Sequence, residues 1–154
     1  MRQMSKLSIR KANTPADASD LDALLWNVLW KPLGLSRDVR KGFSIKGEQV
    51  ELVALMEGHI VGGLVAIWTD KNSVEIRHIA VSAEKQCLGI GKKLVTVLIE
   101  ELSLKGCRSL HTIARNSSVN FFKKLNFQNA SGIAPEHPVF VKHNITFHLM
   151  ERHI

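Results

Sequence analysis

The chain has 154 residues, of which 45% are hydrophobic, and this length and composition predict one compact domain that fills a core of its own. Lysine and arginine outnumber aspartate and glutamate by 21 to 14, and the net charge of +7 favours an anionic partner such as nucleic acid, a membrane surface or a phosphorylated small molecule. No stretch approaches the roughly 20 apolar residues of a membrane span, and Met1 to Arg10 lacks the apolar core of a signal peptide, so we expect a soluble, cytoplasmic protein without a membrane partner.

The predicted elements begin with a short strand and a helix. Alternation of apolar and polar residues predicts a strand over Leu7 to Arg10, and leucines at helical spacing predict a helix over Asp17 to Trp30. The stretch from Lys31 to Gly47 contains two further glycines, at 34 and 42, and a proline, and it fits a short helix followed by a loop.

Two β-rich runs follow, Val50 to Met56 and Ile60 to Trp68, and the Gly58-His59 pair between them predicts a hairpin turn. Runs joined by so short a turn are expected to pair antiparallel. A turn over Asp70 to Asn72 then leads into another strand, predicted over Val74 to Val81.

The second half of the chain alternates helices and strands. A helix is predicted over Gly91 to Leu104, with Gly106 ending it. Its apolar stripe consists of Leu94, Val95, Leu98, Ile99 and Leu102. A strand over Leu110 to Ala114, a helix over Ser117 to Leu125 and a last strand over Ile145 to Met150 complete the pattern. One strand-helix-strand crossover among hairpins predicts a mixed sheet of the α+β class.

A glycine-bearing turn, Gln86-Cys87-Leu88-Gly89-Ile90-Gly91-Lys92-Lys93, lies between a predicted strand and a predicted helix. Its glycines let a bulky anion approach the main chain, and the unpaired amides of a helix start can hold a phosphate. The alternative is an ordinary turn that binds no anion, which has the same glycine pattern. The segment is neither a P-loop, which needs G-K-[ST], nor a dinucleotide fingerprint, because Leu94 stands where a third glycine would be.

Two segments together resemble a known family. Glu75 to Val81, followed by Gln86-x-x-Gly89-x-Gly91, resembles the central motif of the GNAT superfamily of N-acetyltransferases, a strand running into a [QR]-x-x-G-x-[GA] turn. Ala114 to Phe127 resembles their second motif, commonly ending in F-Y-x-K-L-G-F. The resemblance implies a single N-acetyltransferase domain over residues 1–154, with a central, mostly antiparallel, splayed mixed sheet of six to seven strands flanked by about four helices.

The resemblance also implies an activity and a coenzyme site. The acetyl group of acetyl-CoA would pass to a primary amine of a small molecule or protein by direct attack in a ternary complex. Main-chain groups on the strand would contact pantetheine, amides of the glycine turn would surround the pyrophosphate, and the second motif would lie along the coenzyme. The residues implied to bind it are Ile79, Ala80, Val81, Gln86, Cys87, Leu88, Gly89, Ile90, Gly91, Lys92, Asn116, Phe121 and Phe122.

A base is needed because an ammonium ion has no lone pair with which to attack. Some members of the superfamily carry a basic glutamate six residues before the strand-end valine, and Glu75 stands six residues before Val81. Glu75 is therefore the first candidate. His78 is the second, because an ordinary histidine pKa of about 6.5 suits proton transfer. Each residue also has a non-catalytic interpretation: Glu75 as a solvated residue at the start of a strand, and His78 as a histidine packed on the face of a strand.

The sequence departs from the family pattern at the general acid. Many relatives have a tyrosine at the position of Phe122, and this chain contains no tyrosine. Water or another group would protonate the leaving thiolate, or the thiolate would leave unprotonated. Asn126 replaces the usual glycine of K-L-G-F, and asparagine tolerates the left-handed backbone conformation best after glycine.

The tryptophans and the tail bear on the acceptor. Trp26, Trp30 and Trp68 either line an acceptor pocket or belong to the core. The segment Asn144 to Phe147 resembles a G-I-P-H segment in the last strand of one bacterial subgroup, with Phe147 in place of its histidine. The acceptor preference of that subgroup is therefore not carried over.

No metal is expected, because the two cysteines form no C-x-x-C pair and none of the seven histidines has a recognised metal-ligand spacing. Two other functional classes stay open. An acyl-CoA sensor with weak or no catalysis would account for the missing tyrosine. A nucleic-acid-binding module would account for the charge, but the basic residues are scattered and no known signature occurs, so nucleic acid is not expected. The acceptor amine and a homodimer are left open.

Overall fold

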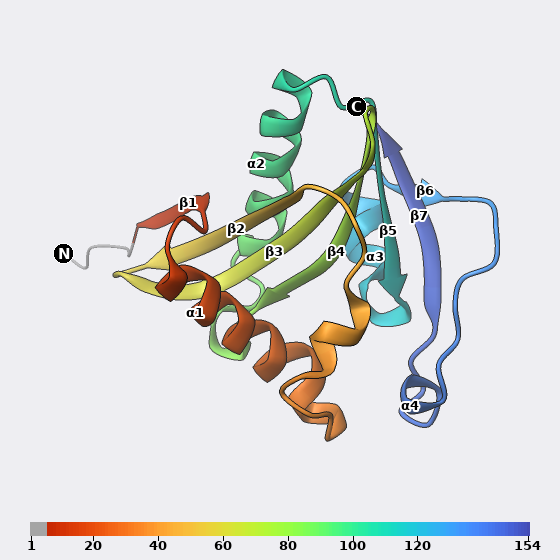
Figure 1. The fold of residues 1–154 in the computed structure, drawn as a ribbon, viewed down its shortest axis with the longest axis horizontal. Helices are drawn as coiled ribbons and strands as arrows, with labels where there is room; N and C mark the ends of the chain where they lie inside the picture. Colours follow the sequence, from red (N-terminus) through yellow and green to blue (C-terminus); the bar gives the residue numbers. More distant parts are fainter. Residues whose placement is uncertain (1–5) are drawn as a thin grey trace.

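The protein folds around one seven-stranded sheet with helices on both faces (Figure 1). This computed structural model describes residues 6–154, so the first five residues of the segment Met1 to Arg10 lie outside the described part. The strands are β1 Leu7–Lys11, β2 Gln49–Met56, β3 His59–Asp70, β4 Ser73–Val81, β5 Ser109–Arg115, β6 Gln128–Asn129 and β7 Phe147–His153. The α-helices are α1 Pro15–Leu25, α2 Ile90–Leu104, α3 Val119–Lys124 and α4 Pro138–Val141.

The sheet order is β1-β2-β3-β4-β5-β7-β6, with β4 and β5 parallel and the other neighbours antiparallel. In Figure 1, α1 lies in front of the sheet and α2 behind it. This arrangement confirms the predicted α+β fold, with its mostly antiparallel mixed sheet and about four helices. The helices within residues 6–154 include none with the length and uninterrupted apolar character that a bilayer crossing requires.

Helix α1 begins two residues before the predicted start, because Thr14 caps it and Pro15 occupies its first turn. The Thr14 hydroxyl accepts a hydrogen bond from the Asp17 amide at 3.0 Å. From Trp26 to Trp30 the chain continues as a wider π-helical turn, and a 3₁₀ turn over Lys31–Leu33 extends the helical path beyond the predicted end at Trp30.

The β2–β3 hairpin pairs antiparallel as predicted, but its turn lies one residue earlier. Glu57 and Gly58 both have positive φ, 52° and 78°, while His59 already belongs to β3. Two successive positive φ angles are the signature of a type I′ turn, whose twist matches that of the flanking strands. The predicted Gly58-His59 turn is therefore wrong by one position.

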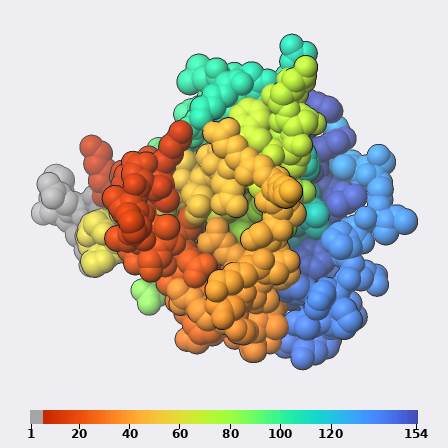
Figure 2. Space-filling view, viewed as in Figure 1, coloured from red at the N-terminus to blue at the C-terminus, as the bar shows by residue number. Residues whose placement is uncertain are grey.

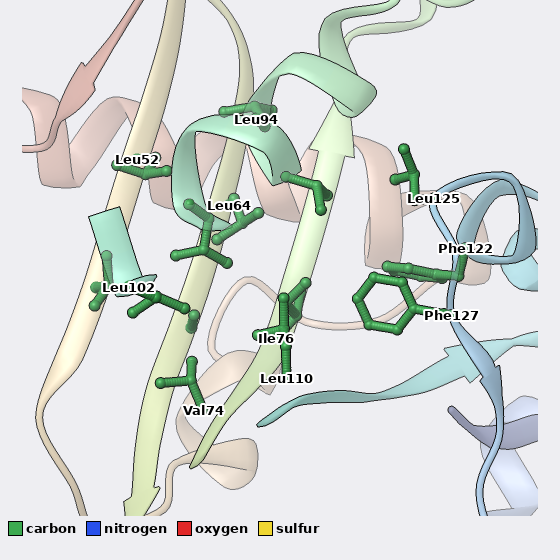
Figure 3. Close-up of a cluster of buried hydrophobic side chains, with 14 of the residues drawn as sticks. Leu52, Leu64, Val74, Ile76, Leu94, Leu102, Leu110, Phe122, Leu125 and Phe127 are labelled. Atoms are coloured by element: carbon green, nitrogen blue, oxygen red, sulfur yellow. The ribbon is translucent and has the colours of Figure 1, made fainter. Parts of the chain in front are cut away.

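Helix α2 covers one face of the sheet with leucines at helical spacing. Leu94, Leu98 and Leu102 are fully buried, and Figure 3 shows two of them, Leu94 and Leu102, beside core side chains of β2, β3 and β4. Burying each such leucine contributes about 1.5–3 kcal/mol. Ile99, predicted for the same stripe, is only half-buried. Gly106, with φ 83°, lies just past the helix end as predicted, and the Cys107 amide donates back to the Leu102 carbonyl at 3.0 Å.

The segment of residues 31–47 crosses the α1 face of the sheet. It contains two 3₁₀ turns, Lys31–Leu33 and Val39–Phe43. In Figure 2 the orange part of the chain, which includes this segment, lies against the blue C-terminal part. The rings of Phe43 and Phe140 approach to 6.3 Å between centroids, which brings this segment next to α4.

The C-terminal elements differ from the predicted ones mainly in their ends. The predicted helix over Ser117 to Leu125 is a 3₁₀ turn, Asn116–Ser118, followed by α3. The last strand runs from Phe147 to His153 instead of from Ile145 to Met150, and the short elements β6 and α4 were not predicted. Asn126 adopts a left-handed φ of 67°, as expected for the residue that replaces a glycine.

Candidate functional site

The parallel strands β4 and β5 pair at one end and separate at the other. Their pairing runs only from Ser73 opposite Ser109 to Ile76 opposite Thr112. Beyond that point β4 stays paired with β3, and β5 stays paired with β7. The facing edges of β4 and β5 are therefore free of each other along the second half of each strand. We call this opening the fork.

A side-chain hydrogen bond and a bulge lie where the fork begins. The buried Thr112 hydroxyl donates to the Ile76 carbonyl at 3.0 Å, which ties the two strands at their last paired position. On the other edge of β4, the pairing with β3 shifts between Val65 opposite His78 and Ala66 opposite Ile76, so Arg77 is an extra residue. Such a bulge bends its strand, and here it lies at the position where the pairing of β4 with β5 ends.

A cavity of about 300 Å³ occupies the fork. Its walls come from both layers of the molecule, because Phe122 belongs to the core beneath α2 while Trp30 and Phe140 belong to the core beneath α1. The cavity therefore passes through the plane of the sheet. Its lining residues are Leu29, Trp30, Phe43, Ile76, Arg77, His78, Ile79, Thr112, Ile113, Ala114, Arg115, Ser118, Phe122, Pro135, Glu136, His137, Phe140 and Phe147.

The start of α2 presents unpaired amides beside the end of β4. Gly89 precedes the helix with a left-handed φ of 80°, and a Cβ built there would meet nothing within 4 Å. The first helical bond runs from the Lys93 amide to the Gly89 carbonyl at 3.0 Å. Within the described residues, no protein group accepts a hydrogen bond from the amides of Ile90, Gly91 or Lys92, and no side chain caps the helix.

Gly91 and Phe121 fix how α2 meets α3. A Cβ on Gly91 would lie 3.1 Å from the Phe121 ring, so the close approach of α3 favours glycine at this helical position. The Phe121 ring meets the Phe122 ring edge-on at 5.0 Å, and Phe122 is fully buried at the cavity wall. Both phenylalanines predicted to lie along the coenzyme are thus next to the fork or the helix start.

The other predicted coenzyme residues lie along β4 and in the turn. Ile79 lines the cavity, Ala80 is buried in the core beneath α1, and Val81 is half-buried at the strand end. The residues Gln86, Cys87, Leu88 and Lys92 are exposed. Cys87 has a left-handed φ of 65°, and the Gln86 side-chain amide donates to the Val81 carbonyl at 3.2 Å.

The side chain of Asn116 is engaged with the segment before β7 and not with the cavity. Its amide nitrogen donates to the Asn144 carbonyl at 3.2 Å, and its carbonyl accepts from the Thr146 amide at 3.2 Å. These bonds hold the end of β5 against the segment before β7. Asn116 does not line the cavity.

Glu75, the first candidate for the base, is buried outside the cavity wall. Arg77 donates a hydrogen bond to its carboxylate at 2.7 Å, and the His111 Nε2 atom lies 3.9 Å away. Arg77 also donates to the Phe43 carbonyl at 2.6 Å. The carboxylate is thus compensated by a neighbouring guanidinium, which in turn orients the 31–47 segment.

His78, the second candidate, does line the cavity. Its ring packs edge-on against Trp30 at 5.1 Å between centroids. Burial, and after it the positive charges of Arg40, Arg77 and Arg115, lower the His78 pKa to about 3. The imidazole is therefore neutral at neutral pH and carries a free lone pair.

Sequence reasoning missed the aromatic and basic side chains that close the cavity on the α1 side. Phe43, Phe140 and Phe147 form part of this wall, and the Arg115 guanidinium lies over the Phe140 ring at 5.6 Å. The sequence does contain a signal for Arg115, because an arginine is unusual at the end of a buried strand. This arginine also lies within the segment Ala114 to Phe127 that resembles the second family motif. The phenylalanines carry no such signal.

The tryptophans divide between wall and core. Trp30 is 3% exposed and lines the cavity, so it belongs both to the core and to the cavity wall. Trp26 and Trp68 are half-buried against the two cores and do not line it. Across residues 6–154, no group of three or more metal-ligating side chains is placed to hold a metal ion.

Comparison with known proteins identifies a family and a shared fold. The model of the acetyltransferase (GNAT) family matches residues 15–127. Among solved structures, Escherichia coli ElaA superposes with a TM-score of 0.76 at 14% identity, covering 97% of this chain and 99% of that one. Tetrahymena GCN5 gives 0.74 at 17%, covering 96% of both chains. An aminoglycoside 6'-N-acetyltransferase complexed with coenzyme A gives 0.74 at 17%, again covering 96% of both. No curated protein sequence matches.

Proposed function

Because the chain belongs to the acetyltransferase (GNAT) family and is therefore an acyltransferase, we propose that it moves the acetyl group of acetyl-CoA to a primary amine by direct attack in a ternary complex. The observation that carries the proposal is the cavity in the fork. Its wall includes residues of the cores on both faces of the sheet, and the unpaired amides at the start of α2 lie beside the end of β4, the strand that lines it. We infer that a coenzyme and an acceptor meet inside it from opposite sides.

Acetyl-CoA would enter from the α2 side. The amides of Ile90, Gly91 and Lys92, with the Gln86 to Gly89 turn, would hold the pyrophosphate, because they lack protein acceptors and carry the positive end of the helix dipole. Pantetheine would pair with main-chain groups of Ile79 to Val81. This edge of β4 has no strand partner, since β5 has already separated.

The chemistry would take place where the two ligands meet. The amine nitrogen attacks the thioester carbonyl, the C–S bond breaks, a proton leaves the nitrogen, and coenzyme A departs as a thiolate. An amide near Val81 would face the carbonyl oxygen, where negative charge develops. Phe122 can contact the thiol arm but cannot protonate it, so the thiolate would leave unprotonated or take a proton from water.

We assign the proton acceptor to His78 in preference to Glu75. The choice rests on position, because His78 lines the cavity while Glu75 lies outside the wall and is paired with Arg77. The lowered pKa makes the His78 imidazole a weaker base than an ordinary histidine. Glu75 would act as a positioning residue through Arg77. The guanidinium groups near His78 also favour the neutral, attacking form of a bound amine, because they repel the ammonium form.

The test is a thiol-release assay with acetyl-CoA and a panel of primary amines, together with calorimetric titration of acetyl-CoA. Binding with turnover of at least one amine is the expected result. Binding without turnover across a broad panel would favour the acyl-CoA sensor instead. No binding of acetyl-CoA would overturn both.

Two variants separate the candidate bases. Replacing His78→Gln should lower kcat by about 100-fold or more with little change in acetyl-CoA affinity. Replacing Glu75→Gln should have a smaller effect that appears mainly in the acceptor KM, because it frees Arg77 to move. The reverse order of effects on kcat would return the role of base to Glu75.

A further inference from the structure

Arg115 places a positive charge inside the cavity. It is the last residue of β5, it is half-buried, and it lines the cavity wall. One guanidinium nitrogen donates to the Leu29 carbonyl at 2.8 Å, and the group lies over the Phe140 ring. The carbonyl and the ring orient the guanidinium, but neither neutralises its charge.

No carboxylate compensates Arg115 within residues 6–154, unlike the other two guanidiniums that act on His78. Arg77 is paired with Glu75, and Arg40 with Asp22 and Glu51. Glu136 also lines the cavity, but it is exposed to solvent and forms no ion pair with Arg115. Burial alone lowers the Arg115 pKa, which is the mark of a guanidinium that has lost water without gaining an anion.

The coenzyme does not supply the missing anion, if it binds as proposed above. Its phosphates would lie at the start of α2, and the part that enters the fork, pantetheine with the acetyl thioester, is uncharged. The anion must then belong to the acceptor. A cavity of about 300 Å³ walled by Trp30, Phe43 and Phe140 suits a small molecule rather than a protein segment.

Resting on the proposed function, we propose that the acceptor is a small primary amine that also carries a carboxylate, and that Arg115 recognises this carboxylate. One uncompensated guanidinium matches one carboxylate, and its planar donors suit two parallel hydrogen bonds. The aromatic wall adds contact for an apolar side chain next to the charge. Arg115 is thus a specificity-determining residue of the acceptor site.

The turnover test compares matched acceptors. Free amino acids and their carboxamides, which keep the amine and the side chain but lack the carboxylate, are assayed at saturating acetyl-CoA. Wild-type protein should prefer the amino acid by about 10- to 100-fold in kcat/KM. Arg115→Gln should abolish the preference while leaving acetyl-CoA affinity unchanged, and Arg115→Lys should retain part of it. An equal loss for both members of each pair would show a structural role and overturn the proposal.

Arg152→Gln is the matched control. Arg152 is also half-buried and also donates to a backbone carbonyl, that of Leu125 at 2.9 Å, but it does not line the cavity. This variant should keep the carboxylate preference of wild type. If both variants lose it, the effect comes from the fold and not from Arg115.

A binding test without coenzyme separates this proposal from the proposed function. 3-Phenylpropanoate and 3-phenylpropanamide are titrated into the wild-type protein while Trp30 and His78 resonances are followed by NMR. Tighter binding of the carboxylate, lost in Arg115→Gln, would support the carboxylate site even if no amine is acetylated. Equal binding of the two probes would overturn it even if acetylation is found.

Discussion

Gly89 combines two properties that make it the sharpest test of the coenzyme site. Its φ of 80° lies in the left-handed region, and the space beside its Cα is open. A side chain placed there has room in the unliganded protein, at the cost of backbone strain, and it stands at the helix start where the pyrophosphate is proposed to lie.

We expect Gly89→Glu to weaken acetyl-CoA binding by about 100-fold or more, because a carboxylate within roughly 4 Å of a phosphate costs a few kcal/mol in a partly solvated site. Isothermal titration calorimetry measures this change. Gly58→Glu is the matched control, since Gly58 has φ 78° and equally open space but lies in the β2–β3 turn. Unchanged affinity in Gly89→Glu would place the pyrophosphate elsewhere.

His78 makes the stability of the protein depend on pH in a defined window. Its pKa is about 3 in the folded state against 6.5 ordinarily, so below pH 6.5 the unfolded chain binds a proton that the folded chain does not. Stability should therefore fall as the pH drops from about 6.5 towards about 3, by at most about 1.4 kcal/mol per pH unit from this group. Above pH 6.5 the group has no effect.

Urea unfolding of wild type and His78→Gln at pH 7, 6, 5 and 4 checks this expectation. The difference between the two curves should change with pH in the direction that favours the variant at low pH. Curves that stay parallel from pH 7 to 4 would contradict the burial of a neutral imidazole.

Helix α1 is joined to β1 through the carboxylate of Asp17. Arg10 on β1 forms an ion pair with it, and the Asn13 amide donates to it at 3.0 Å. Because the Asp17 amide is itself bound by the Thr14 hydroxyl, one residue completes both the helix cap and the contact between the two elements.

Asp17→Asn should lower the melting temperature at neutral pH, because it removes the charge that Arg10 requires. The hydrogen bonds of Arg10 hold the Asp17 pKa at about 2 against 3.8 ordinarily. The wild-type advantage should thus be complete above about pH 4 and lost as the pH falls through about 2. Thermal melts across this range measure it. Asp20→Asn, an exposed position of the same helix, should show no such trend.

The elements that the sequence predicted well are those whose local pattern agrees with their packing. Leucines four residues apart in α2 all face the sheet, and the glycine after the helix has the conformation that glycine permits. The residues at which helices and strands begin and end were harder to predict. Glu57 takes a positive φ that its identity does not favour, because the strand register of the hairpin outweighs the local preference.

The π-helical turn and α4 could not be predicted because distant contacts stabilise them. The Trp26 indole donates to the Leu35 carbonyl at 3.0 Å, and Trp30 packs on His78 of β4. The four-residue helix α4 places Phe140 against Phe43 and Phe147. Neither set of contacts leaves a periodic pattern in the sequence.

The whole fold could be predicted in outline, because the order of strands and helices and the two motifs agree on one sheet architecture. The cavity could be predicted only through the resemblance, since the separation of β4 from β5 depends on a bulge and on which strand joins the far side of β5. Arg115 and the aromatic wall became visible only when residues 29, 43, 115 and 140 were brought together by the fold.

The fork leaves the sheet divided into two parts that are joined by the short pairing of β4 with β5. The strands β1 to β4 form one part, the strands β5 to β7 the other, and four residue pairs with the Thr112 hydroxyl join them. A molecule lying in the opening would take the place of the missing strand and span both parts. Occupancy would then couple the two parts mechanically, so that the filled protein would be the more rigid one and its backbone amides along β4 would exchange with solvent more slowly.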